Sequence, residues 1–105
     1  MTNLIPTIPT DLADQINYSE SSIVSKILLN SEKLQITLFA VDKDQSFSEH
    51  TTTKEAIVHV IEGEGEFYIK DKWYSFKEND YFYMPPNCIH SIKAKSKFKF
   101  LLYQF

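Results

Sequence analysis

Residues 50–63 read HTTTKEAIVHVIEG, and residues 79–90 read NDYFYMPPNCIH. Each stretch contains a histidine and a short run of β-branched or aromatic residues that is flanked by turn-forming residues. This pattern is typical of strands. His50 and His90 stand 40 positions apart in the chain. Only a sheet that folds back on itself can bring two such distant residues together, and this requirement guides the interpretation of the remaining sequence.

Further β-type runs continue outward from these two stretches on both sides. They recur at a spacing of about 8–12 residues, which is typical of an all-β sandwich or barrel. Polar, glycine-containing or proline-containing turns separate them. The runs are IVSKILL from Ile23, KLQITLFAV from Lys33, AIVHVI from Ala56, EFYIK from Glu66, WYSF from Trp73, YFYM from Tyr81, CIHSIKA from Cys88 and FKFLLYQF from Phe98.

The chain divides into an N-terminal arm, residues 1–22, and a β-barrel domain, residues 23–105. Pro6 and Pro9 interrupt regular structure in the arm. Thr10 is expected to cap one helical turn over residues 11–16, DLADQI. No linker or repeat follows, so a single domain is predicted.

Composition limits the classes of partner. The 105 residues carry a formal net charge of −3, which argues against a nucleic acid or an anionic membrane surface as the main partner. Cys88 is the single cysteine, so no internal disulfide is expected, which favours a reducing compartment and a cytoplasmic location. Neither a membrane-spanning run nor a signal peptide is expected from the sequence.

The two opening stretches resemble the two motifs of the cupin superfamily. The first motif runs Gly, five residues, His-x-His, three or four residues, Glu, six residues, Gly, and His50 and Gly63 match it. The second runs Gly, five residues, Pro-x-Gly, two residues, His, three residues, Asn, and Pro85 and His90 match it. The resemblance implies an all-β fold, the double-stranded β-helix (jelly-roll) barrel, of the small single-domain, RmlC-like type.

The match departs from the family pattern at ligand positions. Thr52 replaces the second histidine, and Ala56 stands where the glutamate belongs, with Glu55 one residue too early. In family members with a full set, two histidines, the glutamate and the second-motif histidine hold a divalent metal. Only His50 and His90 carry over, so two alternatives stay open: no metal, or a weakly held Zn, Ni, Fe or Mn ion on these two imidazoles.

The resemblance places a ligand site in the mouth of the barrel. We expect His50, Thr52, His90 and Tyr83 to contact a small-molecule ligand there, and no catalytic residue is assigned. Side chains alternate along a strand, so if position 56 faces inward, Glu55 faces outward unless a bulge turns it.

Three functions stay open at this point. The leading hypothesis is a small-molecule-binding cupin with a reduced or absent metal site. The second is a metal-dependent enzyme of the dioxygenase, isomerase or lyase type. The third is a non-catalytic structural or regulatory module that forms a homodimer, since several strands are apolar on both faces and require cover on both sides.

Overall fold

The computed structural model describes residues 1–50 and 52–105, and for residues 48–50 it describes the backbone alone. The described residues form ten strands and one short 3-10 helix, η1 (Ala13–Gln15). The strands are β1 (Thr2–Asn3), β2 (Ile23–Asn30), β3 (Gln35–Val41), β4 (Ser46–His50), β5 (Ala56–Glu62), β6 (Gly65–Ile69), β7 (Lys72–Phe76), β8 (Tyr81–Met84), β9 (His90–Ala94) and β10 (Phe98–Gln104).

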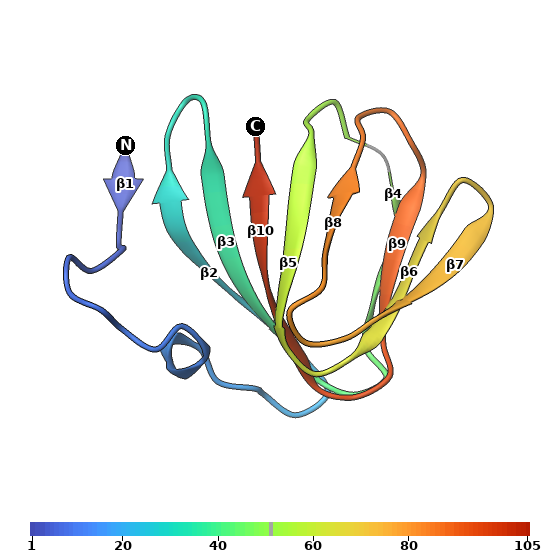
Figure 1. Cartoon of the computed structure of the whole chain (residues 1–105), viewed down its shortest axis with the longest axis horizontal. Helices are drawn as coiled ribbons and strands as arrows, with labels where there is room; N and C mark the ends of the chain where they lie inside the picture. The colour runs from blue at the N-terminus through green and yellow to red at the C-terminus, as the bar shows by residue number, and fades with distance from the viewer. Residues whose placement is uncertain (51) are drawn as a thin grey trace.

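The strands form two antiparallel sheets that face each other. The larger sheet has the order β1-β2-β3-β10-β5-β8, and the smaller has the order β4-β9-β6-β7. Figure 1 shows the two sheets converging at their lower ends and diverging at their upper ends. Non-consecutive neighbours such as β3, β10 and β5 give the crossovers of a jelly roll, so the all-β barrel predicted from the sequence is confirmed.

Alternation along each strand divides the side chains between the inside and the outside of the barrel. In β5, Ala56, Val58 and Val60 are at most 1% exposed and belong to the inner core, whereas Ile57 and His59 alternate onto the other face. The inner core packs the two sheets together and includes Val41, Phe67, Phe76, Met84, Ile92, Ala94, Phe98 and Phe100. This two-sheet packing is the main source of stability for the fold.

A second apolar cluster lies on the outer face of the larger sheet, beneath the N-terminal arm. Its buried members are Ile16 from the arm and Leu28, Leu38, Ala40 and Leu101 from the sheet. The arm therefore covers part of a sheet face that would otherwise be exposed to water.

A group of polar contacts fixes the arm to this face. The Lys99 ammonium donates a hydrogen bond to the Ala13 carbonyl oxygen at 2.6 Å and lies 3.9 Å from Glu62 Oε2. The Tyr18 hydroxyl donates to the same Glu62 oxygen at 2.7 Å, and Lys99 Nζ lies 4.9 Å from the centroid of the Tyr18 ring. We call Ala13, Tyr18, Glu62 and Lys99 the arm clamp.

The helical turn of the arm differs from the one expected. Thr10 does not cap it, because its hydroxyl donates to the Ile8 carbonyl instead. The Asp11 carboxylate accepts a hydrogen bond from the Asp14 amide, and the turn shortens to η1. Within the described residues, no helix has the length and apolarity needed to cross a bilayer.

Candidate functional site in the barrel interior

The pairing of β4 with β9 sets the two motif histidines side by side along the backbone. His50 is the register partner of His90 in this antiparallel pair. His90 lies on the same face of β9 as the core residues Ile92 and Ala94, and it is 1% exposed. The His50 side chain lies outside the described residues, so its proposed contact with a ligand or metal stays a prediction.

The backbone around His90 sets the tautomer of its neutral ring. Nδ1 lies 3.0 Å from the Cys88 carbonyl oxygen, two residues earlier in the β8–β9 turn. A carbonyl oxygen only accepts hydrogen bonds, so Nδ1 must carry a proton. In the neutral ring Nε2 is then the nitrogen with a lone pair, the form in which histidine ligates metals or accepts a proton.

The other two ligand positions of the motif hold no strong donor. Thr52 is half-buried, and its hydroxyl accepts a hydrogen bond from the Lys54 amide at 3.2 Å. The Ala56 methyl group is buried on the inner face of β5. Among residues whose side chains are described, no three of the types His, Cys, Asp and Glu come together as a metal site. Thr52 and Ala56 thus supply neither an imidazole nor a carboxylate at two positions where the family pattern has metal ligands.

Glu55 faces outward, as strand alternation predicts, and does not replace the missing carboxylate. Its backbone pairs with Phe105, and its Oε1 accepts a hydrogen bond from the Tyr83 hydroxyl at 2.7 Å. Tyr83 is the register partner of Ile57 and is 47% exposed. The hydrogen bond to Glu55, and secondarily desolvation, raise the pKa of Tyr83. The Tyr83 hydroxyl is thus engaged on the outer side of β8.

The barrel interior contains a cavity of about 500 Å³ that opens between β7 and β8, the edge strands of the two sheets. We call it the barrel cavity. Aromatic side chains form most of its wall, and few charged groups border it. Its lining residues are Phe67, Ile69, Lys70, Tyr74, Ser75, Phe76, Asp80, Tyr81, Phe82, Tyr83 and Pro85. Tyr83 is the member of the expected ligand set that borders this cavity.

Three phenylalanine rings in mutual contact line the barrel cavity and join the two sheets. The Phe67 and Phe82 rings lie 4.2 Å apart between centroids with an interplanar angle of 27°, and Phe76 lies 5.7 Å from Phe82. Phe82 comes from the larger sheet, while Phe67 and Phe76 come from the smaller one. Such ring pairs contribute about 0.5–1.5 kcal/mol each beyond burial, so this wall is a firm one.

His90 and Thr52 are not among the lining residues of the barrel cavity, but His90 is adjacent to one of them on the neighbouring strand. It is the register partner of Ile69, which lines the cavity. Sequence reasoning placed the site by its histidines and did not identify Ile69, Lys70, Tyr74 or Ser75. The available signal was the inward alternation of β6 and β7, but its use required knowing which two strands end the sheets.

A comparison with known protein families gives one match, which agrees with the fold. A family model described as "Cupin domain" matches residues 37–103. A comparison with curated proteins gives no match.

Solved structures similar to this chain cover nearly all of it. A cupin superfamily protein from Desulfitobacterium hafniense superimposes with a TM-score of 0.92 at 28% identity, over 99% of this chain and 95% of that one. A conserved protein of unknown function from Streptococcus pyogenes gives 0.90 at 26% identity, over 98% and 90%. A cupin 2 conserved barrel domain protein from Leptotrichia buccalis gives 0.85 at 32% identity, over 90% of this chain and 46% of that one.

Proposed function

The chain belongs to the cupin superfamily, and on that premise we propose that its barrel cavity binds a small molecule, with a divalent-metal site that is reduced or absent. The observation that carries this proposal is the ring-lined cavity of about 500 Å³ between β7 and β8. Ligand pockets usually measure about 300–1,000 Å³ and combine apolar walls with a few polar groups. His50, Thr52 and His90 are the polar side chains that we assign to this ligand. Tyr83 borders the same cavity, while its hydroxyl is engaged with Glu55.

The reduced metal site is supported by the chemistry of the motif positions. Thr52 and Ala56 supply neither an imidazole nor a carboxylate, so His50 and His90 would have to hold an ion with water. Loss of even a supporting partner lowers metal affinity by about 10- to 100-fold, and two missing ligands should lower it further.

Isothermal titration of the metal-free protein with Zn, Ni, Fe(II) and Mn tests the metal half of the proposal. We expect no binding, or binding weaker than micromolar that His90→Ala abolishes. Sub-micromolar binding of any of the four ions would contradict it and would favour the metal-dependent enzyme alternative. In that case His50→Ala and His90→Ala should each reduce turnover once an activity is known.

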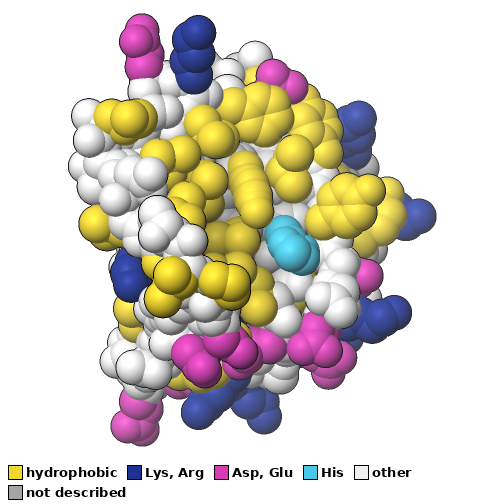
Figure 2. Space-filling view, turned by 60° about the vertical axis from the view of Figure 1, so that its left-hand side comes forward, with side chains coloured by type: hydrophobic (Ala, Val, Ile, Leu, Met, Phe, Trp, Pro, Cys, Tyr) yellow, Lys and Arg dark blue, Asp and Glu magenta, His cyan; other side chains and the backbone are white. Residues whose placement is uncertain are grey.

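We also propose that the protein forms a homodimer through the outer face of the larger sheet. Figure 2 shows hydrophobic side chains gathered over a broad face with a histidine among them. A shallow hollow of about 260 Å³ on this face is lined by Ile57, His59, Tyr81 and Tyr103. Tyr81 is 78% exposed, and exposed apolar surface of this kind commonly marks a protein interface. Among the described residues, its lining holds no Asp, Glu, Lys or Arg, which suits a second copy of the same acidic chain, since a two-fold interface sets like groups against each other.

Sedimentation of two matched variants tests the dimer. Ile57→Asp puts a charge on the proposed interface, whereas Ile27→Asp puts one on the opposite face of the same sheet, where Ile27 is 43% exposed. We expect the first variant to be a monomer and the second to match the wild type. A wild-type monomer at high concentration would contradict this proposal and leave the cavity proposal standing.

A cytoplasmic location is the last part of the proposal. Cys88 is half-buried and free, and a small β domain held by its core without disulfides is suited to a reducing compartment.

A further inference from the structure

The wall of the barrel cavity determines which shape and polarity of ligand fits it. Phe67 and Phe82 stack on each other, Phe76 packs against Phe82 at a tilt, and Tyr74 lines the cavity from β7. Rings prefer offset-stacked or edge-to-face contact with other flat apolar groups. The cavity therefore suits a flat, largely apolar molecule better than a heavily hydroxylated one.

The charged groups that line the cavity stand at opposite ends of it. Asp80 precedes β8, and its carboxylate already accepts a hydrogen bond from the Lys77 amide at 2.8 Å. Lys70 follows β6 at the other end, where it also lines a second, separate hollow together with Asn87 and Cys88 of the β8–β9 turn. Figure 1 shows β6 and β8 both ending at the top, so Lys70 lies at the end that leads toward His90.

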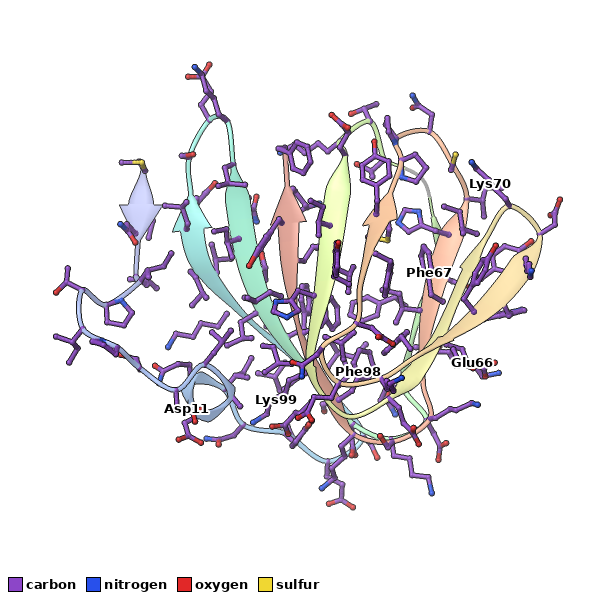
Figure 3. All side chains as sticks on the ribbon, viewed as in Figure 1. Asp11, Glu66, Phe67, Lys70, Phe98 and Lys99 are labelled. Carbon is purple, nitrogen blue, oxygen red and sulfur yellow. The ribbon has the colours of Figure 1, made fainter. Side chains whose placement is uncertain are left out.

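Lys70 is the one cation among the described residues that line the cavity. Figure 3 shows it at the tip of the β6–β7 hairpin, with Phe67 further down the same strand. Lys72, on the same hairpin, lies with its Nζ 5.2 Å from the centroid of the lining Tyr74 ring and adds positive charge nearby. The adjacent Asp71 carboxylate accepts a hydrogen bond from the Tyr68 hydroxyl, whose side chain alternates away from the cavity. Two lysines against one aspartate give this hairpin tip a formal charge of +1.

We propose that the barrel cavity takes an aromatic anion, a flat apolar molecule with one carboxylate or sulfonate group, and that Lys70 pairs with that group. The ring system lies on the Phe67–Phe82 wall, and the anionic group points to the Lys70 end, away from Asp80. This inference rests on the proposed small-molecule function and adds the chemical class and the orientation of the ligand.

Two fluorescent probes of similar shape, one negatively charged and one neutral, test this assignment. 8-Anilino-1-naphthalenesulfonate is an aromatic anion, and N-phenyl-1-naphthylamine is its neutral counterpart. Methyl NMR locates both probes: Ile69 lines the cavity, and Ile57 on the outer face reports binding elsewhere. We expect both probes to shift the Ile69 methyl signal.

Lys70→Asn removes the charge with little risk to the fold. Lys70 has a positive φ of 51°, a conformation that asparagine tolerates better than lysine. Lys33→Asn, an exposed change in the β2–β3 turn, is the matched control. We expect Lys70→Asn to weaken sulfonate binding by about two- to fivefold, as for an exposed ion pair, and to leave the neutral probe and the control unchanged. In the wild type, added salt should weaken the sulfonate and not the neutral probe.

The possible results separate this inference from the function on which it rests. If both probes shift Ile69 but neither Lys70→Asn nor salt changes their relative affinity, the assignment of Lys70 is wrong and the cavity function stands. If neither probe shifts Ile69, the cavity does not bind such molecules, and both proposals are overturned.

Discussion

Replacing Lys99 by methionine should release the N-terminal arm without unfolding the barrel. Lys99 is 8% exposed, and its ammonium donates a 2.6 Å hydrogen bond to the Ala13 carbonyl. A hydrogen bond to a charged group contributes about 1.5–3 kcal/mol, and the contact with the half-exposed Glu62 adds about 0.2–1 kcal/mol. Methionine keeps the apolar stem and therefore retains the packing. We expect the arm to open about 30- to 150-fold more often, which corresponds to about 2–3 kcal/mol.

Amide hydrogen exchange measures this opening directly. The Gln15 amide donates to the Leu12 carbonyl in η1, and its exchange reports the arm. Amides of β10 report on the barrel, and their exchange rates should be nearly the same in the variant as in the wild type. Lys97→Met is the matched control, because Lys97 also lies over the Tyr18 ring, at 5.5 Å, but is exposed and outside the arm clamp. Equal exchange of Gln15 in the two variants would refute the argument, since the hydrogen bond to Ala13 would then contribute nothing.

Three further predictions concern stability. Gly63→Ala should cost about 2–5 kcal/mol in urea unfolding, because Gly63 has a φ of 82° and an added Cβ would lie 2.6 Å from Phe98 Cβ. Burial raises the pKa of Tyr18, and the hydrogen bond and charge of Glu62 raise it further. The protonated Tyr18 therefore contributes its full stability below the unfolded pKa of about 10, and that contribution is lost as pH rises through the folded pKa. Tyr18→Phe should flatten the fall of the urea midpoint above about pH 10. Phe82→Ala should lower stability by about 2–4 kcal/mol and abolish binding of the neutral probe, whereas the exposed Lys33→Asn should change stability by about 0.5 kcal/mol or less.

The fold followed from the sequence where strands carry apolar residues on at least one face. The β-type runs from Ile23 to Phe98 all contain strands, because alternating or continuous apolar residues require two-sheet packing. Two strands gave no such signal. β1 has two polar residues, and β4 carries Phe47 as its one large apolar residue. Both take their strand form from pairing with a neighbour, β2 and β9 respectively, rather than from their own composition.

The site was harder to predict because it depends on strand order. The spacing of His50 and His90 predicted a common location, and their backbones are register partners in the β4–β9 pair. Strand alternation predicted an outward Glu55 unless a bulge turned it, and in the structure the Glu55 carboxylate accepts a hydrogen bond from the outward-facing Tyr83. The cavity itself depends on β7 and β8 ending their sheets beside each other, which no local pattern reveals. Lys70 could therefore not be recognised as a cavity residue from the sequence.

The entrance to the cavity lies along two strands that each lack a hydrogen-bonding neighbour on that side in the described sheets. Its frame is therefore main chain, a row of N–H and C=O groups from β7 and β8 that is the same whatever side chains those strands carry. Substitution of lining side chains can change which ligand the cavity binds, while the main-chain donors and acceptors at its entrance stay the same. A barrel built in this way can change its preferred ligand over evolutionary time without any change in the backbone of the cavity entrance.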